Sequence, residues 1–526
     1  MSQLPIDSTF PLIYRISHNV TLILILCGLS GAAVVAQTPN SVRSTEQFVE
    51  QQVRAGEDVD LNERPAREIE AKFLGDLIES YRPPSNKPYR GISIENAEIS
   101  GDLELKAISV PYRLALENCT FNGAVNFFAS SFQRGLSLRG GIFNGPAAFY
   151  QISVDGDLRV NKAQFKSESE TNFDGIKVTG NTFFYYTKFD GPFNLSNSNL
   201  GTLECAGEDQ EYGHTEFRSS AEFYDLRVVG DASFTHASFD GTVNFGSVDI
   251  GKNLELTDVR FSNPSADVGC FSMRVEGNAV FNDAKFLGGF NLGKAHVGGN
   301  LEFARTEALN PKQTKMFSGI KVDSFILDGA VLAAPYDLQG ADYHRLSMTT
   351  AGRDASLDLI EASTYSTDTY TQLEAYYRRI GLEGAADDVY IAGKKRERNE
   401  AFNQRGIANL PQYLASWIFY IAAGYGKHKQ LALVWSIVFI GIGYWVFREE
   451  KHMMVQKAED ASRYKGRYHP LWYSIALFLP IVDLEDAKTW APRIERRKSR
   501  FYMRLHIILG YLLIPIGLAA WTGLIK

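Results

Sequence analysis

The densest group of residues that could do chemistry lies in the middle of the chain. Between Gly201 and Ser220 the sequence places carboxylates, a thiol and an imidazole, namely Glu204, Cys205, Glu208, Asp209, Glu211 and His214. Such groups bind divalent cations when their spacing suits the metal. This spacing matches neither an EF-hand loop nor a zinc site. We therefore interpret the stretch as a solvated acidic surface loop rather than a cation- or ligand-binding loop.

No enzyme motif accompanies these residues. The sequence lacks Gly-x-Gly-x-x-Gly, a Walker loop, His-Glu-x-x-His and Gly-x-Ser-x-Gly. We expect His236 and His296 at surface or corner positions, Asp483 and Glu485 at a solvated loop end, and His506 at a membrane interface. The sequence therefore predicts no catalytic, cofactor-binding or metal-binding residue, no cofactor, and a protein that is not an enzyme.

Composition further restricts the functions that the chain could have. The chain has 526 residues and a formal net charge of -7, which argues against general nucleic-acid binding because that needs a basic footprint. The cysteines are too far apart for a Cys-x-x-Cys site or a disulfide framework; they are Cys27, Cys119, Cys205 and Cys270.

An internal repeat would position any site in this region. Apolar residues recur with alternating steps of five and six from Ile94 to Ala308. A second apolar residue often precedes them by two, as Leu103 precedes Leu105, which indicates extended segments. Glycine, as at Gly123, follows every second apolar position by seven residues in most units, and we expect it to supply positive φ at tight corners. Each 11-residue unit should hold two short strands.

This pattern resembles the pentapeptide-repeat family, in which a small or apolar residue, a polar residue and a central Leu or Phe recur every five residues. Ala97-Glu98-Ile99, Val125-Asn126-Phe127 and Ala237-Ser238-Phe239 carry the resemblance, which covers about Ile92 to Tyr343. The chain departs from the family by one added residue in every second repeat. The resemblance implies a right-handed, four-sided β-helix, here with about 22 residues per coil and about nine coils, on the order of 40–45 Å long.

Soluble members of that family bind proteins, some by mimicking the DNA duplex with an acidic face. From Arg90 to Arg345 the chain has 32 Asp and Glu against 22 Lys and Arg, a net charge of -10. The excess of acidic residues is spread thinly over the rod, and an export signal would separate the rod from cytosolic DNA enzymes. We therefore expect neither DNA mimicry nor a nucleic-acid partner.

Both ends of the repeat need a cover, because an open stack is an aggregation edge. Residues 37–89 are expected to form a helical N-terminal cap, with a helix over about 47–81 whose apolar stripe includes Ile69 and Leu77. After the repeat at 90–345, residues 346–409 should form a helical connector. Its αα-hairpin spans about 368–405, with Thr369 as a cap and a basic run, 394–398, facing solvent or lipid headgroups.

The chain ends are apolar. Residues 1–36 have the charged start, the apolar run and the Val-x-Ala site of a signal peptide, or else form an uncleaved anchor. Residues 410–526 are expected to form a helical membrane domain. It would hold an interfacial helix at 414–425, spans at 431–447 and 505–525, and a re-entrant segment at 471–484 that contains Pro480.

Charge predicts the orientation of this domain. Between Arg448 and Arg504 there are 13 Lys and Arg, so the positive-inside rule places this loop in the cytoplasm and the β-helix on the periplasmic or outer side of the inner membrane. Anionic lipids are expected near a cluster beside the second span, formed by Arg493, Arg496, Arg497, Lys498 and Arg500.

Two hypotheses for function follow. The first is a membrane-anchored, non-catalytic scaffold or protein-interaction rod whose partner is unidentified. The second is an ion-channel-like transport or signalling protein with the β-helix as its sensor, because the two-span region loosely resembles a degenerate two-helix ion-channel pore unit. Gly424-Tyr425-Gly426 precedes both spans and so does not suit a selectivity filter, which favours the first hypothesis.

Overall fold

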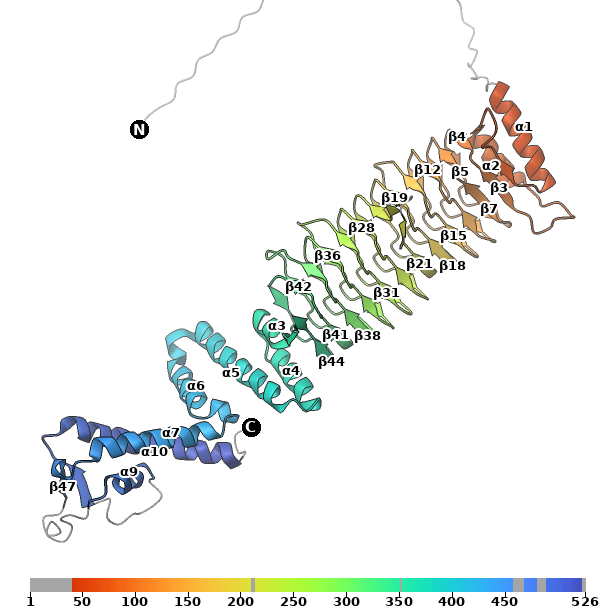
Figure 1. The fold of residues 1–526 in the computed structure, drawn as a ribbon. Coiled ribbons are helices and arrows are strands. Elements are labelled where there is room, and N and C mark those ends of the chain that lie inside the picture. The colour runs from red at the N-terminus through yellow and green to blue at the C-terminus, as the bar shows by residue number, and fades with distance from the viewer. Residues whose placement is uncertain (1–39, 210–212, 351, 457–467, 480–488, 523–526) are drawn as a thin grey trace, which may run out of the picture.

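The computed structural model describes residues 40–209, 213–350, 352–456, 468–479 and 489–522. Stacked β-coils form a rod with helices at both ends, and a group of apolar helices follows at the C-terminal end (Figure 1). The expected signal peptide, 1–36, lies outside the described residues. The fold is therefore mainly β, a parallel solenoid of about 11 coils spaced about 22 residues apart.

Four columns of short parallel strands make the four sides of the rod. One side is a 12-stranded sheet, called here the twelve-stranded face. Its strands are β2 (Glu68–Glu70), β4 (Glu98–Ser100), β8 (Thr120–Phe121), β12 (Ile142–Phe143), β16 (Gln164–Phe165), β19 (Lys188–Phe189), β24 (Glu216–Phe217), β28 (Ser238–Phe239), β32 (Arg260–Phe261), β36 (Lys285–Phe286), β39 (Glu307–Ala308) and β42 (Val331–Leu332).

The next side is an 11-stranded sheet. Its strands are β5 (Leu103–Glu104), β9 (Val125–Asn126), β13 (Ala147–Ala148), β17 (Thr171–Asn172), β20 (Phe193–Asn194), β25 (Ala221–Glu222), β29 (Val243–Asn244), β33 (Val268–Gly269), β37 (Phe290–Asn291), β40 (Lys315–Met316) and β43 (Tyr336–Asp337).

The two remaining sides share one 19-stranded sheet. Its short strands are β1 (Val59–Asp60), β3 (Ile92–Glu95), β6 (Ser109–Val110), β7 (Leu114–Glu117), β10 (Ser131–Phe132), β11 (Leu136–Ser137), β14 (Ser153–Val154), β15 (Leu158–Arg159), β26 (Arg227–Val228), β27 (Ala232–Ser233), β30 (Asp249–Ile250), β31 (Leu254–Glu255), β34 (Arg274–Val275) and β35 (Ala279–Val280). Five longer strands join the sides, namely β18 (Lys177–Phe183), β21 (Asn199–Glu204), β38 (His296–Glu302), β41 (Lys321–Ile326) and β44 (Asp342–Ser347). Where β18 meets β21 the register shifts between Val178 and Asn181, so the corner survives inside the longer strand.

The solenoid has about 11 coils rather than the nine expected from the apolar period. The apolar period from Ile94 to Ala308 does not include the first and last coils. At the N-terminus β1 pairs with β3 and β2 pairs with β4, although no repeat is visible there. At the C-terminus β41 still pairs with β44, because backbone hydrogen bonding continues where the side-chain period has become irregular.

Aromatic ladders fill the rod. On the inner side of the twelve-stranded face eight rings stack in successive coils with centroid separations between 4.4 and 5.2 Å. They are Phe121, Phe143, Phe165, Phe189, Phe217, Phe239, Phe261 and Phe286, all at most 3% exposed. Alternation directs the second residue of each two-residue strand inward, and parallel register places it over its equivalent one coil away.

The role expected for the repeated glycines is wrong at most positions. A Cβ on Gly123 would lie 2.3 Å from the carbonyl oxygen of Gly101, and one on Gly241 would lie 2.4 Å from that of Ser219. Neither glycine has positive φ. These glycines are needed because the backbone of the preceding coil lies too close for a side chain. The positive φ occurs elsewhere, mostly at non-glycine turn residues such as Asn118 (φ 53°).

The N-terminal cap is only partly helical, so the expected helix over 47–81 is wrong in its middle. Helix α1 (Asn40–Ala55) and helix α2 (Ala71–Ser80) flank β1 and β2, and Ile69 belongs to β2. Leu77 of α2 is buried, and the Tyr81 ring packs edge-on against Tyr112 at 4.8 Å. Strand pairing overrides the apolar stripe, and α2 covers the first coil.

Helices α3 (Ser356–Ala362), α4 (Thr367–Arg379) and α5 (Glu383–Arg405) follow a small hairpin of β45 (Thr349–Thr350) and β46 (Arg353–Asp354). The αα-hairpin is confirmed, but Ser366 is the N-cap residue of α4, not Thr369. The hydroxyl of Thr369 is buried and donates to the carbonyl oxygen of Leu338 at 3.4 Å. Thr369 therefore fastens the hairpin to the last coil.

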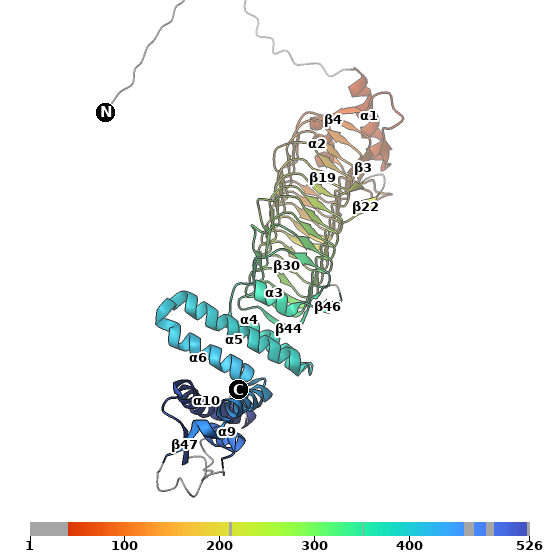
Figure 2. The ribbon, with the colours of Figure 1, turned by 60° about the vertical axis from the view of Figure 1, so that its left-hand side comes forward.

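The C-terminal region contains α6 (Leu410–Ala423), α7 (Gln430–Phe447), α9 (Pro470–Phe478) and α10 (Arg497–Thr522), together with 3-10 turns at Gly406–Asn409, Gly424–Gly426 and Glu450–His452. A hairpin of β47 (Met453–Val455) and β48 (Trp490–Pro492) lies beyond α7, at the far end of the molecule from the solenoid (Figures 1 and 2). Helices α7 and α10 are long and apolar enough to cross a membrane. Helix α10 begins eight residues before the expected span, and α6 begins and ends earlier than expected.

Candidate binding surface on the solenoid

The acidic stretch after β21 is a hairpin projecting from the stack, formed by β22 (Glu208–Asp209) and β23 (Gly213–His214). The structure separates the predicted group. Cys205 is fully buried in the rod and Glu204 lies on β21, while Glu211 falls outside the described residues. Burial, and then the nearby Asp231 carboxylate, raise the pKa of Glu204. The surface-loop interpretation therefore fails for Cys205, whose position belongs to the apolar period.

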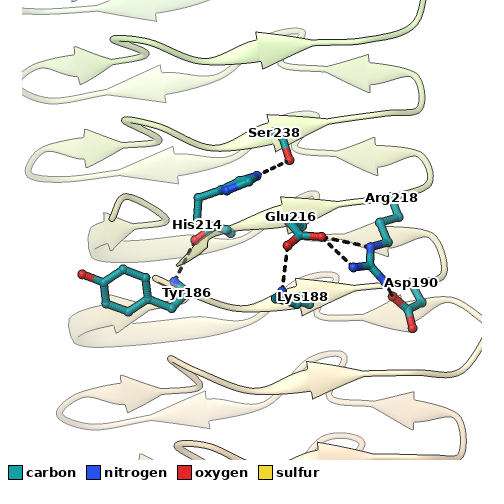
Figure 3. A network of polar contacts seen from close by, with 8 residues as sticks. Tyr186, Lys188, Asp190, His214, Glu216, Arg218 and Ser238 are labelled. Carbon is teal, nitrogen blue, oxygen red and sulfur yellow. Dashed lines mark hydrogen bonds and ion pairs between the residues drawn. The ribbon is translucent and has the colours of Figure 1, made fainter. Parts of the chain in front are cut away.

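Ion pairs cross two coils beside this hairpin (Figure 3). Lys188 Nζ lies 2.8 Å from Glu216 Oε1, and Arg218 Nη2 lies 2.7 Å from Glu216 Oε2. Arg218 Nη1 also donates to Asp190 Oδ1 at 2.7 Å. Burial alone would raise the pKa of Glu216, but hydrogen bonds from Lys188 and Arg218 outweigh it and that pKa is lowered. Glu216 is thus an ionised carboxylate already occupied by two cations.

A hollow of about 640 Å³ lies next to these pairs and extends over four coils, from β24 to β36. His214 bounds it at one end, where its Nε2 shares a hydrogen bond with Ser238 Oγ at 3.0 Å (Figure 3). Its other lining residues are Glu216, His236, Ala237, Asp240, Asp258, Val259, Arg260, Ser262 and Lys285. The lining is mainly polar, so the hollow suits a charged or hydrogen-bonding group rather than an apolar ligand.

Two cations share the far half of the hollow. Arg260 and Lys285 are opposite one another in adjacent parallel strands, and both side chains are exposed. Like charges in this relation repel. Within the described part of the chain neither has a carboxylate within 4.0 Å, whereas Lys188, on β19 of the same face, is paired with Glu216. The apolar period could not reveal this pair, because it concerns residues on the outside of the coils.

The described cysteines do not supply a nucleophile. Cys119, Cys205 and Cys270 are buried and unpaired inside the rod. Burial raises the pKa of Cys119 and of Cys270 to about 12 and that of Cys205 well above its ordinary range. The reactive thiolate is therefore scarce at neutral pH. Among the described residues no group of three or more His, Cys, Asp and Glu is placed to hold a metal ion.

The other predicted residues are scattered. His236 occupies a turn with φ 65°, as expected for a corner, and His296 is exposed on β38. Asp483 and Glu485 lie outside the described residues. Arg497, Lys498 and Arg500 form the first turn of α10 instead of a loop, with Arg493 and Arg496 just before it. The five basic residues of the expected lipid cluster therefore remain close together in the chain.

His506, expected at a membrane interface, has a side chain that is fully buried among α7, α9 and α10. Its Nε2 lies 3.0 Å from the carbonyl oxygen of Ser474, and its Nδ1 lies 3.3 Å from the Tyr502 hydroxyl. Packing of the short helix α9 against the two long ones encloses this ring. A single-helix hydropathy pattern does not contain that contact.

The basic run before α6 is also misassigned in part. Arg398 is only 8% exposed, its guanidinium lies 4.2 Å from the ring centre of Trp417, and its Nη1 donates to the Tyr425 hydroxyl at 3.1 Å. Arg396 Nη2 donates to the carbonyl oxygen of Ser363 at 2.7 Å, after the end of α3. These arginines connect helices, and Tyr425 of the Gly-Tyr-Gly triplet is a buried hydrogen-bond partner.

A scan of protein-family models, a search of curated proteins and a search of solved structures each found no match to this chain.

Proposed function

We propose that this protein is a membrane-anchored, non-catalytic interaction rod related to the pentapeptide-repeat family. The observation that carries the proposal is the polar hollow on the twelve-stranded face, placed on a rod whose interior is filled by stacked phenylalanines. A filled interior leaves only the outer faces for ligands. Ion pairs and hydrogen bonds give those faces fixed charge patterns, which suit recognition of another protein.

Family membership is supported by the coil itself. Four sides and an inward Phe or Leu at most central positions are what that family implies, with Val or Ile at most of the others. The coil of about 22 residues departs from the family's five-residue period by the residue added to every second repeat. The added residue in every second repeat accompanies the tight approach of successive coils at residues such as Gly123 and Gly241.

Anchoring in the inner membrane is supported by α7 and α10. Tyr502 contacts the carbonyl oxygen of Phe439, and Gly517 lies against Ala432, so the two helices are antiparallel. The basic start of α10 and the end of α7 therefore share one side, which the positive-inside rule assigns to the cytoplasm. On this proposal the solenoid is periplasmic, the cluster from Arg493 to Arg500 contacts anionic lipids, and α6 lies at the opposite interface.

Limited proteolysis tests this topology. Protease added to intact spheroplasts should digest or release the solenoid and spare an epitope inserted between Arg448 and Arg504. Digestion of that epitope with protection of the solenoid would invert the orientation and contradict the proposal.

Photocrosslinking in the native membrane tests the interaction role. A photoreactive residue replacing Asp240, which lines the hollow, should yield a discrete protein adduct. The matched control replaces Lys252, whose side chain is 66% exposed on another side of the rod. Equal labelling from both positions would argue against a specific partner on the twelve-stranded face.

Transport or signalling is the second candidate function, and one observation favours it. His506, Ser474 and Tyr502 form a buried polar network among helices that could cross a membrane. Ionisable residues at such positions often mark ion or proton paths. Conductance of the reconstituted full chain that disappears in His506→Leu would raise this function above the first, and silent bilayers would remove it.

A further inference from the structure

The C-terminal half of the twelve-stranded face exposes large apolar side chains. Leu287, Leu309 and Val331 are 53%, 58% and 56% exposed. They belong to three consecutive coils, in which the parallel register places Leu287 beside Leu309 and places Val331 opposite Glu307, two residues before Leu309. Contiguous exposed apolar residues on a soluble surface commonly mark a site of interaction.

The unpaired cations directly adjoin this apolar group. Lys285 is two residues before Leu287 on the same strand segment, and Arg260 is its neighbour in the preceding coil. Glu307 is opposite Lys285 in the following coil but makes no ion pair with it within 4.0 Å. Two positive charges therefore remain available on a solenoid whose net charge from Arg90 to Arg345 is -10.

We infer that Arg260, Lys285, Leu287, Leu309 and Val331 form one docking strip for a protein segment that carries acidic and apolar side chains. The inference rests on the proposed function and names the chemistry of its partner. The strip crosses four adjacent strands, β32 to β42, so it is about 14 Å long at the usual strand spacing. An extended segment of about four or five residues covers that length.

Charge and position favour this occupant. A two-fold contact between copies whose axis runs along the strip would bring Arg260 and Lys285 of one copy toward those of the other, which repel. Lipid is disfavoured because α3, α4 and α5 separate the strip from α7 and α10 (Figure 1). Acidic side chains, by contrast, would neutralise both cations while neighbouring apolar groups cover the leucines.

Peptide selection on the full chain in nanodiscs tests the strip. The probe is a displayed random peptide library, counter-selected on empty nanodiscs. We expect enriched peptides to combine Asp or Glu with Leu, Phe or Trp. In fluorescence anisotropy, the Kd of an enriched peptide should rise about ten-fold or more in Lys285→Glu, Arg260→Glu and Leu309→Ser. A peptide with its acids changed to Lys should regain affinity for Lys285→Glu.

Matched controls are Lys321→Glu in β41 and Val229→Ser just after β26, which change exposed residues away from the twelve-stranded face and should leave the Kd unchanged. Thermal melts identify any variant that fails to fold, and the remaining strip variants then decide. Peptides that bind but ignore every strip variant would overturn the strip and leave the interaction role intact. Enrichment no greater than on empty nanodiscs would overturn both. A dimer that Leu309→Ser converts to monomer in mass photometry would assign the strip to a second copy.

Discussion

The solenoid and the C-terminal helices bury their side chains by opposite means. In the solenoid large residues mark the inside, and Phe239 touches equivalent rings in the coils before and after it. In the helices small residues mark the contacts. A Cβ on Gly510 would lie 2.0 Å from the carbonyl oxygen of Phe478, and one on Gly443 would lie 2.2 Å from Ser474 Oγ. Meanwhile large residues such as Ile437 face outward at 61% exposure.

On the proposed membrane anchoring, this difference follows from the two solvents, water around the solenoid and lipid around the C-terminal helices. Water drives large apolar groups into the rod, whereas lipid offers no such gain and leaves close packing and hydrogen bonds to select helix contacts. Apolarity therefore identifies interior positions in the first region and carries almost no such information in the second.

The largest effect expected from this contrast is the loss of one ring of the rod. Phe234 is 1% exposed and packs edge-on against Phe223 at 5.1 Å and Phe245 at 5.2 Å. Phe234→Ala should lower the free energy of unfolding by about 3–5 kcal/mol, because it leaves a cavity. The control Lys252→Ala, on the outside, should change it by less than about 0.5 kcal/mol. Equal shifts in denaturant melts would show that inside and outside are exchanged.

Replacement of glycine by alanine should change stability in opposite directions in the solenoid and in α7. Gly123→Ala should destabilise the solenoid by about 1–3 kcal/mol, since its Cβ would meet the backbone of the preceding coil. Gly441→Ala in α7 meets nothing within 4 Å and should stabilise the helix by about 0.5–1 kcal/mol. Thermal unfolding of the two variants in detergent measures both. A tolerated Gly123→Ala would contradict the close approach of coils.

A smaller effect is expected where the helices rely on polar contacts. Ser474 Oγ donates to the carbonyl oxygen of Ile440 at 2.8 Å and lies 3.3 Å from His506 Nε2. Ser474→Ala should cost about 0.6 kcal/mol, the typical value for such bonds between membrane helices. Steric trapping or detergent unfolding can measure it. Ser436→Ala is the control, because the hydroxyl of Ser436 donates within α7, to the carbonyl oxygen of Ala432. A similar cost in both variants would remove the special role of the interhelical contact.

The smallest effect concerns pH and the outer carboxylates. Burial raises the pKa of Glu255, and the Glu302 and Asp231 carboxylates raise it further, so the fold disfavours its charged form. Stability due to this group is therefore highest below its unfolded pKa of about 4.3 and falls as pH rises through the folded pKa. Glu255→Gln should raise the Tm at pH 7, by an amount equivalent to a few tenths of a kcal/mol after solvent screening, and leave it unchanged near pH 4.

Glu216→Gln should change the Tm at pH 7 in the opposite direction. The pKa of Glu216 is lowered, so its contribution is present above the unfolded value and lost as pH falls through the folded one. This variant should therefore lower the Tm at pH 7 and have little effect at acid pH. Parallel pH profiles for the two variants would contradict the assignment of their environments.

Much of the rod could be predicted from sequence because its signal is redundant. Phe121, Phe143 and Phe165 recur at 22 residues, so one wrong assignment does not change the period. The glycine role was wrong because a residue without a Cβ can indicate either unusual φ or a close neighbour, and only the stacking distance at Gly123 decides between them.

The candidate surface was less predictable because it depends on which side chains lie opposite one another in adjacent coils. Arg260 and Lys285 are ordinary exposed residues separately, and only their register in adjacent coils makes them an unpaired couple. Ile69 and Thr369 illustrate the same limit at the two caps, where strand pairing and a contact to Leu338 override local propensity. Both of these corrections concern a contact between segments far apart in the chain.

On the proposed periplasmic location of the solenoid, the cap formed by α2 over the first coil has a consequence for export of the chain. A polypeptide threaded through a translocation channel emerges with its N-terminus first, so α2 and the first coil become available before the rest. Each later coil needs only the one before it as a template. Because α2, with the buried Leu77, covers the first coil, further coils can add only at the C-terminal end of the solenoid. Each coil that folds outside the channel then opposes movement of the chain back into the channel. We expect stepwise folding of the coils to make export of the solenoid unidirectional.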